Sequence, residues 1–203
     1  WAYGVIQGFK SIIYLINSKK ILREYVFFQD IGKDSLPTNS KTYNIVNWYL
    51  KWKEGVKNVD TIAHSAPNVS DYKYNNLQVS YIDGLPNLEG IQIVRYFFLQ
   101  VYLIFYSLFF IFIKPYSAIL LSELLKLLRV NLANDKELAR DYLFHSSGPF
   151  YRPIWTYAAE DKGSRILFYF YSTNTENFKT KAGYPIQRPR HLMSWSHYLV
   201  WDK

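Results

Sequence analysis

Apolar positions along the chain follow two different patterns. Two segments, Tyr3 to Ile16 and Tyr43 to Lys53, place apolar side chains at intervals of three or four residues, which predicts amphipathic helices. Other apolar segments are short and end in turn-forming residues: Val59 to His64, Leu77 to Ile82, Tyr142 to Phe144 and Ile166 to Tyr171, the last of which is continuously apolar or aromatic. Continuous apolarity without alternation is typical of strands that are covered on both faces. The pattern therefore predicts an α/β protein with a Rossmann-like, mostly parallel sheet flanked by helices.

The clearest single unit runs from Asp141 to Asn174 and predicts a strand, a loop, a helix and a second strand. The helix is expected from Pro153 to Lys162, because proline suits the first helical turn, where its missing N–H is not needed. Gly163 then suits the left-handed residue just past the end of the helix. Parallel strands in such sheets bind ligands beyond their carboxyl ends, so polar residues at these ends are the first candidates for a site.

The same patterns suggest how the chain is organised. Residues 1–58 are expected to form an N-terminal helical region that packs on a Rossmann-like α/β domain of residues 59–203. Within the first region, Ile21 to Phe28 is an apolar run that fits either a strand or a helix. The aromatic segment from Leu192 to Trp201 predicts a further strand near the end of the chain.

The least polar stretch is Tyr96 to Ile113, in which only Gln100 and Ser107 are strongly polar and which Arg95 and Lys114 flank. Three interpretations remain open: a helix buried in or docked on the domain, a helix lying in a membrane interface, and a helix spanning the membrane. A single spanning helix would place the strands before and after it on opposite sides of the membrane. They could not then share one sheet.

The charge of the chain limits its partners. Its 203 residues carry a formal net charge of +8, which favours phosphates, anionic glycans or a membrane surface. Nucleic acid is not expected, because the basic residues are dispersed and no nucleic-acid-binding module is recognisable. The absence of cysteine excludes disulfides and thiolate metal sites. Four histidines with few nearby carboxylates indicate no metal centre.

The best local candidate for a site is the loop after the Tyr142 strand. His145, Ser146, Ser147 and Gly148 stand there, and Arg152 precedes the predicted helix, whose N-terminal N–H groups and dipole favour an anion. His145 is the candidate catalytic base, a role that requires a partner carboxylate and a pKa near the working pH. The alternative is that these residues only close a strand-to-helix turn.

Other candidates for substrate binding are polar or basic residues near strand ends: Ser172, Thr173, Asn174, His64, Arg188 and Arg190. Such residues also occur in ordinary turns and solvated loops, which is the competing interpretation. No P-loop, dinucleotide-binding glycine pattern, nucleophile elbow or HExxH motif is present. A serine hydrolase is disfavoured, because the elbow glycine and the acid partner are missing.

Three stretches resemble a known family: LPTNSKTYNIVNWYLKW, HSSGPFYRPIWTYAAEDKGSRILFYFYSTN and HLMSWSHYLVWDK. They are similar to bacterial surface-polysaccharide biosynthesis proteins that are named for a PFTS motif. The resemblance covers most of the chain and is densest from Asp141 to Lys203. The sequence departs from the family in one respect, because no PFTS occurs in it.

The resemblance implies a GT-B-like glycosyltransferase with two facing Rossmann-like domains, which transfers sugar from a nucleotide-sugar to a growing capsule or lipopolysaccharide. This chain would be the acceptor side and inactive alone. The nucleotide-sugar, with no other cofactor, is expected in a C-terminal domain that follows and carries PFTS. The expected partners are a glycan or lipid-linked acceptor and a peripheral membrane contact, at the cytoplasmic face of the bacterial inner membrane. The alternative is a non-catalytic, membrane-associated binding module of a polysaccharide assembly system.

Overall fold

The computed structural model describes residues 1–17, 24–38, 44–52, 59–66, 69–145, 152–169 and 194–199. The helices within these ranges are α1 (Ala2–Asn17), η1 (Lys33–Ser35), α2 (Ile45–Lys51), α3 (Ile91–Phe109), α4 (Pro115–Ile119), α5 (Leu121–Leu132), η2 (Asp135–Glu137) and α6 (Trp155–Asp161). The strands are β1 (Tyr25–Phe28), β2 (Thr61–His64), β3 (Tyr72–Tyr74), β4 (Leu77–Tyr81), β5 (Asp141–His145), β6 (Arg165–Tyr169) and β7 (His197–Leu199).

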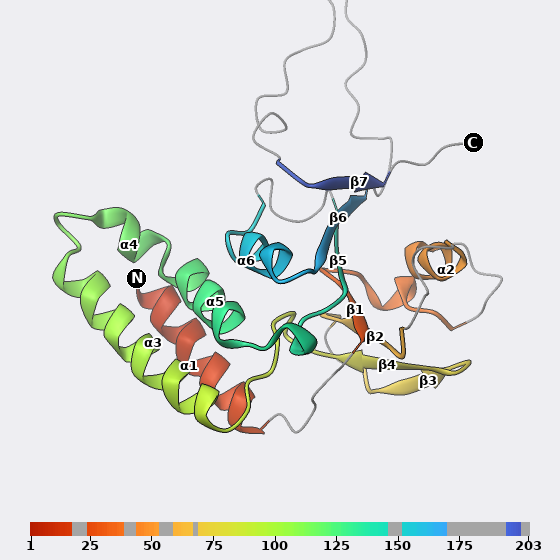
Figure 1. The fold of residues 1–203 in the computed structure, drawn as a ribbon, viewed down its shortest axis with the longest axis horizontal. Coiled ribbons are helices and arrows are strands. Elements are labelled where there is room, and N and C mark those ends of the chain that lie inside the picture. The colour runs from red at the N-terminus through yellow and green to blue at the C-terminus, as the bar shows by residue number, and fades with distance from the viewer. Residues whose placement is uncertain are drawn as a thin grey trace, which may run out of the picture.

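The strands form one seven-stranded sheet in the order β3-β4-β2-β1-β5-β6-β7 (Figure 1). All neighbouring pairs are parallel except β3 with β4, which are antiparallel. Leaving out β3, the strands run outward in chain order from the central pair β1 and β5, which is the order of a Rossmann-like sheet. The predicted fold class, a Rossmann-like, mostly parallel α/β sheet flanked by helices, is confirmed.

Both faces of the sheet are buried, because alternate side chains of the central strands enter two different cores. Val26 and Phe28 pack on the face that α2 covers. Tyr25 and Phe27 pack on the opposite face with residues of α5 and α6, such as Val130. Figure 1 shows α2 on one side of the sheet and α5 and α6 on the other. This two-sided burial is the physical cause of the continuous apolar runs in the sequence.

Most predicted elements are present, with changes at their ends. Helices α1 and α2 and strands β2, β4, β5, β6 and β7 lie within or beside the predicted segments. Gly163 has the expected positive φ of 95°, whereas α6 begins at Trp155 and leaves Pro153 before its first turn. Strand β1 lies inside residues 1–58, which therefore supply a central strand of the sheet as well as helices.

Helices α1, α3, α4 and α5, together with the connection of residues 110–114, form a bundle beside the sheet that we call the helical lobe (Figure 1). Arg129 of α5 fastens the lobe to the sheet. It is fully buried, pairs with Asp83 after β4 at 2.6 Å, and also donates to Ser11 of α1 at 3.0 Å. The lobe is thereby fixed next to the carboxyl end of β4.

Candidate functional site

The strand order places a switch point at the carboxyl ends of β1 and β5. From this pair the chain continues to opposite sides: α2 covers one face of the sheet after β1, and α6 covers the other after β5. In open parallel sheets, ligands bind in the crevice that such a reversal leaves outside the carboxyl ends of the strands. His145 is the last residue of β5 and therefore lies at this position.

His145 contacts the segment that follows β1. Its Nε2 lies 3.1 Å from the backbone oxygen of Asp30, and its ring centroid lies 5.5 Å from that of Tyr169. A carbonyl oxygen only accepts, so this hydrogen bond requires the proton on Nε2 and makes Nδ1 the basic nitrogen of the neutral ring. The side chain itself is 7% exposed.

Asp30 adopts an uncommon backbone conformation at the same place. Its φ is 53°, in the left-handed region, and its N–H donates to the Ser65 hydroxyl at 2.9 Å. Gln29 donates to the Asp30 carboxylate at 2.7 Å, which orients an exposed acid at the mouth of the switch point. Left-handed non-glycine residues concentrate at binding and catalytic sites. Sequence reasoning missed Gln29, Asp30 and Ser65, although they directly follow strands β1 and β2.

Two other predicted site residues are held by contacts inside the protein. His64 ends β2 at the same edge of the sheet but is fully buried, and its Nδ1 accepts the Ala66 N–H at 3.2 Å. Arg152 lies against α6, where it donates to Glu160 at 2.6 Å and to the Thr156 hydroxyl at 2.9 Å. Its guanidinium also stacks on Tyr157 at 3.9 Å from the ring centroid. The structure thus gives Arg152 a role in holding α6.

The remaining predicted site residues lie outside the described part of the chain: Ser146, Ser147, Gly148, Ser172, Thr173, Asn174, Arg188 and Arg190. Their assignment to substrate binding stays a prediction.

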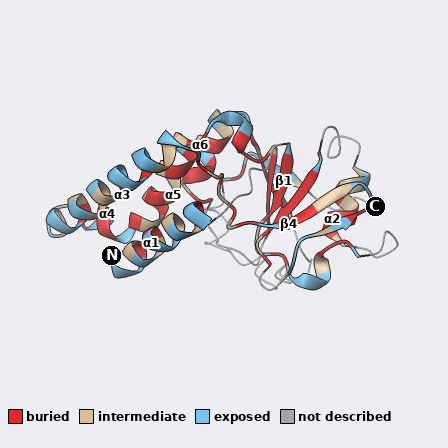
Figure 2. Cartoon of the chain, turned by 90° about the horizontal axis from the view of Figure 1, so that it is seen from below, coloured by how far each residue is buried: buried red, intermediate tan, exposed pale blue. Residues whose placement is uncertain are grey.

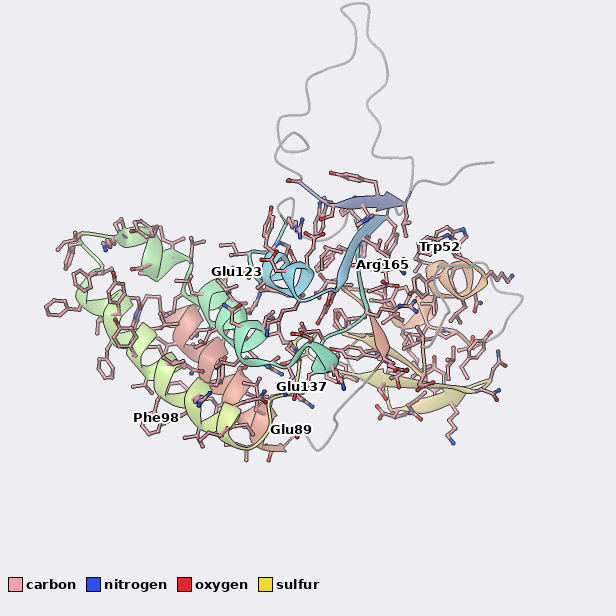
Figure 3. The ribbon with its side chains drawn as sticks, in the orientation of Figure 1. Trp52, Glu89, Phe98, Glu123, Glu137 and Arg165 are labelled. Atoms are coloured by element: carbon pink, nitrogen blue, oxygen red, sulfur yellow. The ribbon has the colours of Figure 1, made fainter. Side chains whose placement is uncertain are left out.

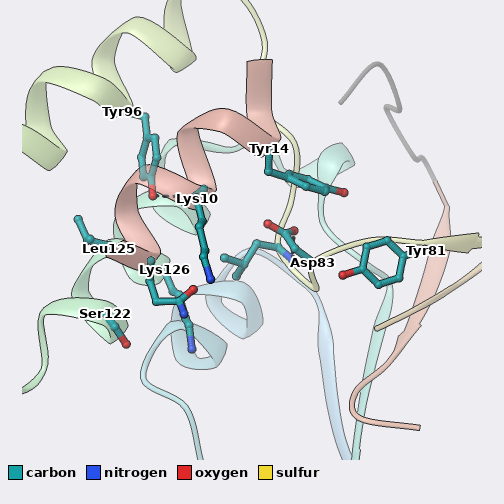
Figure 4. A pocket seen from close by; sticks show the side chains of 11 residues that line it. Lys10, Tyr14, Tyr81, Asp83, Tyr96, Ser122, Leu125 and Lys126 are labelled. Carbon is teal, nitrogen blue, oxygen red and sulfur yellow. Dashed lines mark hydrogen bonds between the residues drawn. The ribbon is translucent and has the colours of Figure 1, made fainter. Parts of the chain in front are cut away.

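A cavity of about 310 Å³ lies between α1, α5 and the end of β4 (Figure 4). Its lining includes two lysines, two tyrosines and one aspartate: Lys10, Lys126, Tyr14, Tyr81 and Asp83. Lys126 pairs with Glu123 and Asp83 pairs with Arg129, whereas Lys10 forms no salt bridge to any described residue. Figure 4 shows Lys10 extending into the cavity between Lys126 and Tyr14. Lysines hold phosphate as point charges and tyrosines pack on sugar rings.

A different charged cluster lies at the opposite ends of the strands, where β5 and β6 begin. Asp141 is fully buried at the start of β5 and accepts two hydrogen bonds from Arg165, at 2.6 and 2.8 Å, and one from Arg140 at 3.1 Å. Tyr49 of α2 donates to the same carboxylate, and Arg165 lies over the Trp52 ring (Figure 3). The cluster ties β5, β6 and α2 together at the amino ends of the strands, away from the ligand edge.

Among the described residues, no three His, Asp or Glu side chains converge in a way that could hold a metal ion. The described side chains at this end of the sheet include a histidine, which is able to exchange a proton, and a lysine, whose charge attracts anions.

The fold defines a Rossmann-like α/β protein, whose candidate ligand site lies at the carboxyl ends of its strands. Residues 106–203 match the family described as polysaccharide biosynthesis PFTS motif protein. This match supports the role in polysaccharide biosynthesis that the resemblance implied. No curated protein and no solved structure is significantly similar to the chain.

Proposed function

We propose that the chain is the acceptor-side part of a glycosyltransferase that extends a bacterial surface polysaccharide. The observation that carries this proposal is the switch point between β1 and β5, where His145 meets the strained Asp30 segment at the ligand edge of the sheet. The match of residues 106–203 to a polysaccharide biosynthesis family supports the proposed substrate class. The nucleotide-sugar donor is expected outside the described residues.

In this proposal, His145 is the general base. Because Nε2 is committed to the Asp30 carbonyl, Nδ1 takes the proton of the acceptor hydroxyl as its oxygen attacks the anomeric carbon of the donor sugar. The bond from the anomeric carbon to the nucleotide diphosphate breaks, and the diphosphate leaves with the electron pair. Asp30 and Gln29 would hydrogen-bond the acceptor sugar beside this hydroxyl.

The cavity beside Lys10 supplies the second part of the proposed acceptor site. A lipid-linked or growing glycan carries phosphate, and the lysine side chains at this end of the sheet match that charge. Tyr14 and Tyr81 offer aromatic surface for the adjoining sugar. The acceptor would thus run along one edge of the sheet, from the end of β4 toward the end of β5.

Complementation in cells tests the catalytic assignment. In a strain that lacks the gene, the whole gene carrying His145→Ala should restore less than one hundredth of the surface polysaccharide, because a general base contributes about 10² to 10⁴ in rate. The matched control is His197→Ala, since His197 is exposed on edge strand β7. Immunoblots must show both proteins at wild-type levels. Full polysaccharide from the His145→Ala gene would contradict the assignment.

The second candidate function is a non-catalytic binding module of a polysaccharide assembly system. It is favoured by the partner of His145 Nε2, which is a backbone carbonyl and not the carboxylate that usually orients a catalytic histidine. This function predicts that His145→Ala leaves the polysaccharide intact, while mutations in the Lys10 cavity still weaken glycan binding.

A further inference from the structure

The surface of the helical lobe is rich in exposed apolar side chains, whereas the rest of the described protein exposes few large ones. Of the 23 large hydrophobic side chains that are exposed among the described residues, 18 belong to the lobe, Trp1 and Leu120 directly adjoin its helices, and only Tyr81, Tyr157 and Tyr198 lie elsewhere. Soluble monomers rarely expose contiguous apolar patches of this extent, and such patches mark protein or membrane interaction sites. Figure 2 shows the exposed faces of α1, α3 and α4.

Helix α3 exposes a wide apolar face. At 3.6 residues per turn, its exposed apolar positions, from Phe97 through Ile91 to Leu99, cover about 200° of the circumference. Phe105 and Phe109 are 66% and 81% exposed, and Phe98 projects outward (Figure 3). A helix that is hydrophobic all round normally lies in a protein core or in a membrane. Helix α3 is not in the core, and it is the one helix among the described residues that is long and apolar enough to cross a bilayer.

The interior of the lobe contains polar side chains beside apolar ones such as Leu15 and Leu121. Gln100, Ser107 and Arg129 are at most 1% exposed. Ser107 accepts from the Trp1 indole at 3.0 Å, and Ser11 of α1 accepts from Arg129 at 3.0 Å and from Tyr96 at 3.3 Å. Helices in lipid join in this manner, with hydrogen-bonding groups turned inward and apolar side chains facing hydrocarbon.

The packing of α1 follows the same rule. Gly4 and Gly8 form a GxxxG pair on the buried face of the helix. A Cβ atom on Gly4 would lie 2.9 Å from Leu121 Cβ, and one on Gly8 would lie 2.5 Å from Gln100 Nε2 of α3 and 3.0 Å from Leu125 Cδ1 of α5. The glycines therefore let the backbone of α1 approach α5 closely, as small residues do between helices in membranes.

Charge complementarity identifies the occupant of this surface. Residues 1–17 and 90–122 contain no aspartate or glutamate, and their charged side chains are Lys10, Arg95 and Lys114. Between α3 and α4, Phe112 and Ile113 are 96% and 74% exposed, next to Lys114. Aromatic and aliphatic side chains with adjoining cations match the headgroup and acyl boundary of an anionic bilayer.

We propose that the helical lobe embeds in one leaflet of an anionic lipid bilayer without crossing it. The crossing is prevented by the sheet, because β1 precedes α3, β5 follows it, and the two strands pair directly. The strands before and after α3 therefore stay on the same side of the membrane. The inference does not depend on the glycosyltransferase activity, and its test below contains no glycan.

Vesicle flotation with the full chain tests the proposal. The chain should float with vesicles of phosphatidylglycerol and phosphatidylethanolamine, and the triple variant Phe105→Ser, Phe109→Ser, Phe112→Ser should bind at least tenfold more weakly. The matched control, Tyr157→Ser with Tyr198→Ser, removes two exposed aromatic side chains outside the lobe and should bind like the wild type. Circular dichroism must show all three proteins folded.

Two further measurements separate embedding in one leaflet from a membrane span and from a protein partner. Lys114→Gln should weaken binding about fivefold on anionic vesicles and have little effect on phosphatidylcholine vesicles. Because the chain has no cysteine, Phe112→Cys can carry a single label. Its fluorescence should be quenched by shallow doxyl lipids of the same leaflet and remain inaccessible to an impermeant quencher enclosed in the vesicle. Access from the enclosed side would overturn the proposal in favour of a span. Equal flotation of the wild type and the Phe triple variant would overturn the proposal, because vesicle binding would then not depend on the lobe. If neither protein binds vesicles and the wild type forms a dimer that the Phe triple variant loses, the lobe binds a second copy of the chain and the proposal is also overturned.

Discussion

At the scale of the residue, Asp141 is the most heavily paired carboxylate of the described chain. Burial alone would raise the pKa of Asp141, but hydrogen bonds from Arg165 and Tyr49 and the charges of Arg165 and Arg140 outweigh this effect and hold the pKa below its usual range. Burial raises the pKa of Tyr49 far above its usual value, so this hydroxyl stays protonated and donates. The cluster therefore stabilises the fold only while Asp141 is ionised.

We expect Asp141→Asn to lower the free energy of unfolding by about 3 kcal/mol at pH 7, because it leaves two arginines without their buried counter-ion. A carboxyl with a lowered folded pKa stabilises the fold above its unfolded pKa of about 4, and this contribution is lost as the pH falls through the folded value. Urea unfolding of both proteins should thus show a difference that shrinks below pH 4. The control Asp34→Asn, at an exposed position, should change stability by less than about 0.5 kcal/mol. A difference that is independent of pH would contradict this account.

At the scale of the element, α1 shows why an amphipathic pattern alone does not tell which face is buried. Its apolar stripe of Ile6, Phe9, Ile13 and Ile16 is exposed, and the face that packs on α5 carries the two glycines. The periodicity predicted the helix correctly but did not indicate what its apolar face contacts. Only the neighbours of the helix reveal the inversion, because the same period describes a helix facing protein and a helix facing lipid.

Gly4→Val tests the packing of α1 on α5. The added side chain meets Leu121 at 2.9 to 3.1 Å, and the Leu121 Cβ can yield only if the helices separate. We expect the free energy of unfolding to fall by about 1–3 kcal/mol, as in other overpacked contacts. Ile6→Val, on the exposed face of the same helix, should be nearly neutral. Equal stability of Gly4→Val and the wild type would show that the glycines are not needed for close approach.

At the scale of the whole molecule, the sequence was sufficient for the class of fold but not for the arrangement of the strands. The runs from Val59, Leu77, Tyr142 and Ile166 predicted buried parallel strands because both faces of the sheet are covered. The pairing of β1 with β5 joins residues more than a hundred positions apart, and no local pattern specifies such a contact. For the same reason, sequence reasoning identified His145 as a strand end but missed Asp30 and Lys10. These two residues come near the carboxyl ends of the strands only through contacts between distant parts of the chain.

The central claim is that the acceptor binds along the carboxyl edge of this sheet, and amide hydrogen exchange of the full chain tests it most directly. The probe is N-acetylglucosamine 1-phosphate, with N-acetylglucosamine and inorganic phosphate measured separately. We expect the sugar phosphate to slow exchange at residues 10–14, 29–31 and 81–85, and N-acetylglucosamine or phosphate alone to slow it less. Lys10→Ala should reduce this protection. The control Lys73→Ala, at an exposed position on β3, should leave it unchanged. Unchanged exchange at these residues, or protection confined to the Asp141 edge, would contradict it.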